Sequence, residues 1–193
     1  MAAAAVSLCM LTGCQPAMSK PSDPSTALRP GDVVPNRFPL RFEEHNFEAY
    51  CYNTVGCRVS YGNVVFGVER SDERSPAPRD AGYRRNWNAT VVGLRNFPPP
   101  AVVTWKSVDG SAHDASVDIG AIFRDQEILH RVPESEIPDG AGYGISPDIF
   151  LEVNDRTISV YMQAMIPTRQ LQVPTNKESN FRNDLVLAWS RTY

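Results

Sequence analysis

Residues of the kinds used in hydrolytic catalysis gather in one short stretch of the chain. His113, Ser116 and Asp118 offer a base, a nucleophile and an acid within six residues. The stretch follows an Asp109-Gly110 pair, which predicts a β-hairpin. Because side chains alternate between the two faces of a strand, we expect His113 and Ser116 to point in opposite directions. A catalytic triad needs the base to touch the nucleophile, so we predict no triad here.

Metal coordination is the other chemistry that these side chains offer. His113, Asp114 and Asp118 are all possible ligands. Asp114 and Asp118 are expected on one face of the strand and His113 on the other. The chain has no His-x-His, His-Glu-x-x-His or EF-hand spacing. We therefore predict a polar hairpin surface, no bound metal or other cofactor, and no enzymatic activity.

A glycine-rich segment, DGAGYG at residues 139–144, invites comparison with phosphate-binding loops. It lacks the Lys-Ser/Thr pair of a Walker loop and the surrounding strand and helix, so it does not predict a phosphate site. One interpretation is a flexible connection between strands. The other is a binding loop that contacts a partner through Asp139 and Tyr143, with the amphipathic tyrosine as its anchor.

The N-terminus has the pattern of a secretion signal. An apolar run at residues 2–11 leads into Thr12, Gly13 and Cys14. This pattern resembles the signal of bacterial lipoproteins, and the resemblance implies cleavage before Cys14, acylation of its thiol and anchoring outside the cytoplasm. The run is too short for a transmembrane helix, which takes about 20 apolar residues. The usual Lys or Arg before the run is missing, which keeps open a chance cysteine or a cut after an Ala-x-Ala-like site.

The cysteines can be counted on this basis. If Cys9 leaves with the signal and Cys14 carries lipid, Cys51 and Cys57 are the pair that remains. A lone, closely spaced pair in an oxidising compartment predicts a disulfide. A metal pair or a redox motif is the alternative, but the spacing is not Cys-x-x-Cys and there is no second pair.

The chain divides into three expected parts. Residues 1–13 form the signal, and residues 14–36, which are rich in Pro, Ser and charged side chains, form a lipidated flexible tether. A coil of about 20 residues averages roughly 25 Å from end to end. Residues 37–193 form a single domain. The net charge of −3, with no basic run, gives no footprint for nucleic acid.

The domain reads as short strands separated by turns. Its one helix candidate is residues 120–131, and a two-residue hairpin turn at Asp109-Gly110 would place Lys106 opposite His113. We predict a mainly β, antiparallel, sandwich-like domain with at most one short helix. The candidate strands are residues 59–68 with a turn at 62–63, 86–94, 101–108, 111–119, 149–153, 157–162 and a buried final strand at 185–189.

Three stretches of this domain resemble small bacterial lipoproteins that confer immunity to type VI secretion toxins. In such lipoproteins a proline-containing segment leads into a strand with a central Trp and then a polar strand. The resemblance implies a periplasmic protein, outer-membrane anchored because no Asp follows Cys14, that binds a toxic effector, often a phospholipase. It carries over no catalytic residues. The stretches are residues 97–124 (FPPPAVVTWKSVDGSAHDASVDIGAIFR), 151–168 (LEVNDRTISVYMQAMIPT) and 181–193 (FRNDLVLAWSRTY).

An acidic patch on such a protein would complement a cationic cleft made for phospholipid headgroups. A structural or assembly lipoprotein of the envelope, or of a secretion machine, is the alternative function, and nothing in the residues separates the two. The expected partner contacts are Asp109, His113, Asp114 and Asp118 on the hairpin, with Asp139 and Tyr143 on the glycine loop.

Overall fold

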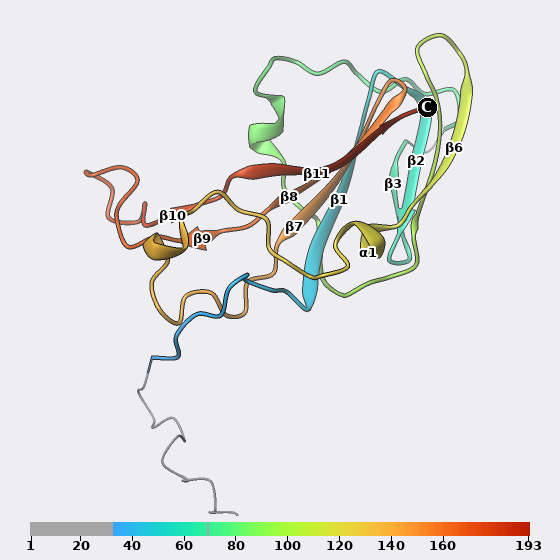
Figure 1. Ribbon diagram of the computed structural model, residues 1–193. Coiled ribbons are helices and arrows are strands. Elements are labelled where there is room, and N and C mark those ends of the chain that lie inside the picture. Colours follow the sequence, from blue (N-terminus) through green and yellow to red (C-terminus); the bar gives the residue numbers. More distant parts are fainter. Residues whose placement is uncertain (1–32, 69) are drawn as a thin grey trace, which may run out of the picture. The chain divides into compact units, whose positions relative to one another are not determined.

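The protein is mainly β, as predicted. The computed structural model describes residues 33–68 and 70–193, and the chain from Val33 to Tyr193 forms one compact unit (Figure 1). The expected signal, Cys14 and most of the expected tether lie outside the described residues. Among the described residues, no helix is long and apolar enough to cross a membrane.

Five strands form the larger sheet, in the order β11-β8-β7-β1-β4. β1 and β7 run parallel, with Phe47 beside Ile149, and every other pair in this sheet is antiparallel. The parallel pair lies in the middle of the sheet, so this sheet is mixed and not purely antiparallel. The strands are β1 (Glu44–Tyr52), β4 (Val91–Arg95), β7 (Asp148–Asn154), β8 (Thr157–Gln163) and β11 (Leu185–Thr192).

Four strands form the second sheet, in the order β3-β2-β5-β6, and all its pairs are antiparallel. A third, two-stranded sheet pairs β10 with β9. Short helical turns connect some of the strands. The elements are β2 (Val55–Tyr61), β3 (Val64–Gly67), β5 (Ala101–Lys106), β6 (Ala112–Val117), β9 (Ile166–Pro167), β10 (Phe181–Arg182), α1 (Ile119–Ile122) and the 3-10 turns η2 (Tyr83–Asn86) and η3 (Glu134–Glu136).

The core lies between the two larger sheets. Alternate residues of β2 and β5, such as Val59 and Val103, are fully buried there, as period-two patterning requires. Phe47 of β1 packs on Tyr61 of β2, with ring centroids 4.4 Å apart. β7 is buried on both faces, because the segment that carries η2 covers the outer face of its sheet over Phe150.

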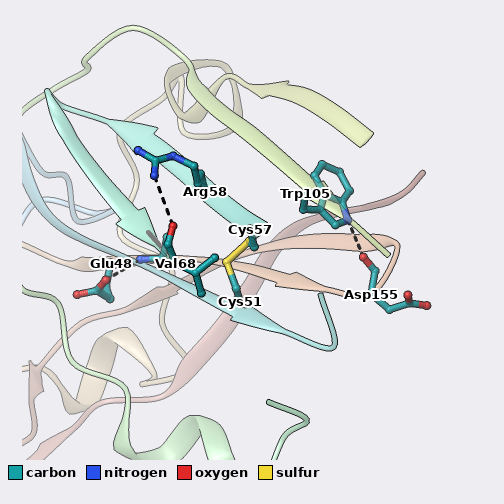
Figure 2. Close-up of a disulfide and its surroundings, with 8 residues drawn as sticks. Glu48, Cys51, Cys57, Arg58, Val68, Trp105 and Asp155 are labelled. Atoms are coloured by element: carbon teal, nitrogen blue, oxygen red, sulfur yellow. Dashed lines mark hydrogen bonds between the residues drawn. A yellow bond between two sulfur atoms is a disulfide. The ribbon is translucent and has the colours of Figure 1, made fainter. Parts of the chain in front are cut away.

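The predicted disulfide is confirmed. β1 turns directly into β2, and Cys51 is bonded to Cys57 across that turn (Figure 2). The bond therefore joins a strand of the five-stranded sheet to a strand of the four-stranded sheet. It fixes the point at which the chain passes from one layer of the sandwich to the other.

The register of the β5–β6 hairpin differs from the prediction by one residue. Trp105, and not Lys106, lies opposite His113. The turn has three residues because the Ser107 amide donates to the Ser111 carbonyl at 3.0 Å. Gly110 adopts a φ of 86°, which is the left-handed position that completes a three-residue turn.

Two further predictions need correction, and one strand was not predicted. Residues 120–131 do not form a helix of that length, because α1 ends at Ile122 and Gln126 adopts a positive φ. The final strand is longer than expected and lies at the sheet edge, so its residues are half-buried or exposed. No strand was predicted at β1, although it lies inside the five-stranded sheet.

Candidate functional site

A groove of about 1120 Å³ lies where β1 begins and β4 ends. Most of its lining comes from three segments far apart in sequence: the chain leading into β1, the end of β4 and the glycine-rich loop before β7. Gln126 comes from a fourth segment. Phe38 and Tyr143 are large exposed side chains on its surface. The lining residues are Arg37, Phe38, Pro39, Arg41, Phe42, Glu43, Glu44, Arg95, Asn96, Gln126, Gly142, Tyr143, Gly144, Ile145 and Ser146.

The glycine-rich loop is tied to the first residues of the domain. The Asn36 amide donates to the Pro138 carbonyl at 2.8 Å and accepts from the Gly142 amide at 3.0 Å. The Tyr143 hydroxyl donates to the Pro35 carbonyl at 2.8 Å. A Cβ on Gly142 would stand only 2.5 Å from Cδ2 of the buried Leu40, so a larger residue here would force that side chain to shift. Residues 33–36 therefore form the back of the wall that presents Tyr143.

Three arginines and two glutamates give the groove a locally positive lining, although the whole chain carries a net charge of −3. Arg41 is the most engaged of the arginines, because it lies 3.9 Å from Glu127 and donates to the Asp125 carbonyl. Arg95 lies opposite Glu44 in the strand register. Arg37 and Arg95 are exposed, so their charges are available at the groove surface.

Behind the groove, Asn96 connects the surface to a buried histidine. The Asn96 side chain lines the groove and donates to the Phe42 carbonyl at 2.9 Å, so its oxygen is left to accept from Nδ1 of His45, 2.8 Å away. Nε2 of His45 then accepts from the Tyr61 hydroxyl at 3.0 Å. Burial lowers the pKa of His45, although its hydrogen bond to Asn96 opposes the shift. His45 is fully buried, so it supports the groove and does not reach its surface.

The hairpin holds a serine–histidine contact, but not with the serine considered from the sequence. Nε2 of His113 lies 3.0 Å from Oγ of Ser107, while Ser116 is on the opposite face of the hairpin. The Ser107 hydroxyl donates to the Asp109 carboxylate at 2.5 Å. The carboxylate therefore contacts the serine and not the histidine, which is the reverse of a catalytic triad. Ser107 is only 1 % exposed, so its oxygen does not face a substrate.

The four hairpin residues expected to bind a partner do not form one patch. Asp109 lies in the turn, where hydrogen bonds from Ser107 and the Ser111 amide lower its pKa to about 2. His113 faces inward and stacks on Trp105, with ring centroids 4.8 Å apart. The remaining two are spread along the hairpin. Asp114 is exposed on the outer face of the sheet, and Asp118 caps α1 beyond the far end of β6 by accepting from the Ala121 amide at 2.9 Å.

Of the two candidates on the glycine loop, only Tyr143 lines the groove. Asp139 is exposed and lies 3.5 Å from Arg169, to which it is ion-paired. The structure thus separates the six candidate contacts into a hairpin group and a loop group. Arg37 and Arg95 were not singled out from the sequence, because residues 58 positions apart give no local signal that they share a groove.

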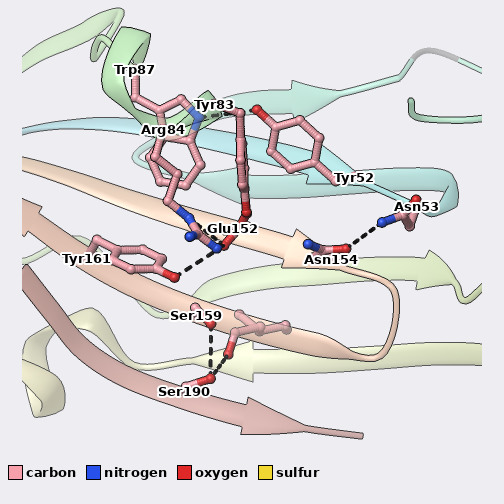
Figure 3. A network of polar contacts seen from close by, with 11 residues as sticks. Tyr52, Asn53, Tyr83, Arg84, Trp87, Glu152, Asn154, Ser159, Tyr161 and Ser190 are labelled. Atoms are coloured by element: carbon pink, nitrogen blue, oxygen red, sulfur yellow. Dashed lines mark hydrogen bonds and ion pairs between the residues drawn. The ribbon is translucent and has the colours of Figure 1, made fainter. Parts of the chain in front are cut away.

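A second polar cluster lies on the outer face of the five-stranded sheet (Figure 3). Glu152 of β7 is 2 % exposed and accepts from Arg84 at 2.7 Å, from Tyr161 at 3.4 Å and from the Tyr83 hydroxyl. Burial, together with the hydrogen bond to Glu152, raises the pKa of Tyr83. The Trp87 ring stacks on Tyr50 with centroids 4.7 Å apart. The cluster fastens the η2 segment to the sheet and leaves no open carboxylate.

Among the residues that the structure describes, no three His, Cys, Asp or Glu side chains gather as a metal site would require. The fold and groove define a class, a β-sandwich protein with an open aromatic and positively charged groove at one sheet end. No family model, curated protein or solved structure matches this chain.

Proposed function

We propose that this protein is a membrane-anchored periplasmic lipoprotein that binds and neutralises a toxin delivered by type VI secretion, a phospholipase in the first instance. The observation that carries the proposal is the groove. It exposes Tyr143 and Phe38 among arginines, and aromatic side chains with arginine are the residues that most often dominate protein–protein binding. In this proposal the protein acts by binding and not by catalysis.

The place of the groove in the chain supports the proposal. The described chain begins at Val33, and Pro35 and Asn36 are bonded to the loop that carries Tyr143. If Cys14 carries lipid, residues 35 and 36 beside the groove lie close in sequence to the membrane anchor. An enzyme that attacks phospholipids works at the bilayer, so the tether raises the concentration of the inhibitor where the toxin acts.

The rigidity of the groove also fits a tight inhibitor. The loop is held by three hydrogen bonds to residues 35 and 36, and the sheet behind it is braced by the buried His45–Asn96 contact. A wall that is ordered before binding loses less conformational entropy on association than a flexible loop. An assembly lipoprotein of the envelope, the alternative function, would use the same groove to bind a component of the envelope or of a secretion machine.

The experiment tests whether the full chain captures a lipase effector. The effectors offered are those encoded beside this gene or a panel of lipase effectors. Wild type should form a stoichiometric complex with one effector, and Tyr143→Ala should weaken it at least about tenfold, as expected for a central aromatic anchor. Asp114→Lys tests the hairpin surface expected from the sequence, and it should bind as wild type does if the groove is the contact. Absence of any effector complex would reject the neutralising function in favour of an assembly role.

A further inference from the structure

We infer that the groove receives an acidic loop of the protein partner, with carboxylates directed to Arg37 and Arg95 and an apolar side chain seated against Tyr143 and Phe38. This inference rests on the proposed function and names the chemistry of the partner's contact segment. It also differs from the expectation drawn from the sequence, in which acidic residues of the hairpin would face a cationic cleft of the toxin.

The charge of the groove favours an anionic partner. The groove lining carries three arginines against two glutamates, within a chain whose net charge is −3. Glu44 accepts from the Ser146 hydroxyl at 3.2 Å and lies opposite Arg95 in the register. A local excess of positive charge on an acidic protein attracts an anionic group to this surface.

The type of cation in the groove favours a carboxylate as its ligand. Every positively charged side chain of the groove lining is an arginine. The planar guanidinium presents paired donors that match both oxygens of a carboxylate, which a lysine ammonium does not. Arg41 is already held by Glu127 and the Asp125 carbonyl, which leaves Arg37 and Arg95 as the better placed pair.

The size and concave shape of the groove favour a protein loop as its ligand. A volume of about 1120 Å³ is far larger than a single carboxylate or phosphate needs. The groove also contains apolar surface from Phe38, Pro39 and Ile145. A concave site cannot lie flat against a bilayer, whereas a protruding loop enters it and buries both its charges and an apolar side chain. We therefore assign the groove to a protein loop and not to the membrane surface.

The probe for this inference is a cyclic peptide with four glutamates around one tyrosine, and its matched control replaces each glutamate with glutamine. The full chain, with Cys14→Ser to prevent lipidation, is titrated with each peptide while amide signals are followed by NMR. The acidic peptide should shift signals around Arg37, Arg95 and Tyr143 in a saturable manner. In Arg37→Glu/Arg95→Glu each arginine loses its charged pair with a peptide carboxylate. The affinity for the acidic peptide should therefore fall at least about tenfold.

Three outcomes overturn the inference. The first is that the glutamine peptide binds as well as the glutamate peptide. The second is that Arg37→Glu/Arg95→Glu binds as wild type does. The third is that Asp114→Lys changes binding and Arg37→Glu/Arg95→Glu does not. Saturable binding to vesicles with 30 % anionic lipid in the absence of peptide binding would assign the groove to the membrane instead. A toxin that is captured equally well by wild type and by Arg37→Glu/Arg95→Glu would reject this inference alone, whereas the absence of any captured toxin would reject the proposed function.

Discussion

Arg84 and Glu152 form an ion pair across the outer face of the five-stranded sheet, with Nη2 2.7 Å from Oε2. The Glu152 side chain is 2 % exposed, and the Arg84 side chain is 34 % exposed. The guanidinium also lies 4.5 Å from the ring centroid of Tyr83 and 5.0 Å from that of Tyr161. The pair thus connects the η2 segment to β7 and encloses a carboxylate that water does not reach.

Arg84→Ala should destabilise the protein, because it leaves Glu152 buried without its counter-ion. We expect a loss of about 2 to 3 kcal/mol in the free energy of unfolding, less than for a fully buried pair because the arginine is partly exposed. Urea unfolding measures this loss. Arg84→Met/Glu152→Gln, which removes both charges, should lose less free energy of unfolding than Arg84→Ala. An equal or greater loss in the double variant would show that the unpaired charge of Glu152 does not cause the destabilisation.

The disulfide gives a second prediction. Cys51 and Cys57 are six residues apart, so the bond closes a small loop. In the loop-entropy model, Cys51→Ala/Cys57→Ala should lower the free energy of unfolding by about 2 kcal/mol. Thermal and urea unfolding with and without a reductant test this. Reductant should destabilise wild type and leave the double variant unchanged, and a wild type that is insensitive to complete reduction would contradict the prediction.

Buried His45 predicts a dependence of stability on pH. Burial holds its pKa below the ordinary value of 6.5 in the folded protein. Below pH 6.5 the unfolded chain therefore binds a proton that the folded protein does not, and the free energy of unfolding falls as the pH falls towards the lowered pKa. One group contributes at most about 1.4 kcal/mol per pH unit.

His45→Gln should flatten this slope between pH 6.5 and 5, although the variant is less stable at neutral pH because the buried network changes. Urea unfolding at a series of pH values gives both quantities. A slope that is the same in His45→Gln and in wild type would mean that the acid sensitivity arises elsewhere.

The hydrogen bonds of Asn36 should hold the glycine-rich loop that forms one wall of the groove. Its side chain makes two hydrogen bonds to the glycine loop, so Asn36→Ala should cost about 1 to 2 kcal/mol locally. The Gly142 amide should then exchange with solvent about tenfold faster, while amides of β7 are unaffected. Ser146→Ala, which removes a hydroxyl from the opposite part of the same loop, is the control. Unchanged exchange at Gly142 would show that residues 33–36 do not hold the wall.

Local patterns were sufficient to predict much of the fold. Turn residues predicted the β2–β3 hairpin at Gly62-Asn63 and the β7–β8 hairpin at residues 154–156. Both hairpins form, although Asn154 is paired in β7 and the second turn is residues 155–156. β1 was missed because Glu44, His45, Asn46 and Glu48 make its sequence look polar. The signal was present in the alternation of Phe47, Ala49 and Cys51, all on one face. The buried His45 is polar in sequence but satisfied by Asn96, a contact 51 residues away.

The site was less accessible to sequence reasoning for a physical reason. The three walls of the groove meet because β1 pairs parallel with β7 and antiparallel with β4. No periodicity within a strand specifies which distant strand becomes its neighbour. Tyr143 was singled out because glycines frame it, and it lines the groove, whereas Arg37 and Arg95 look like ordinary surface charges. Asp109 and Asp118 were proposed as contacts on one hairpin, and the structure places them beyond opposite ends of β6.

The central claim is that the groove neutralises a secreted phospholipase by binding it. The most direct measurement is a titration of the phospholipase activity of the candidate effector on vesicles with the full chain. We predict that the activity falls linearly to near zero at one equivalent and that Tyr143→Ala and Arg37→Glu/Arg95→Glu shift the titration to higher concentrations. Undiminished activity at a large excess of wild type, with every lipase effector offered, would contradict the account.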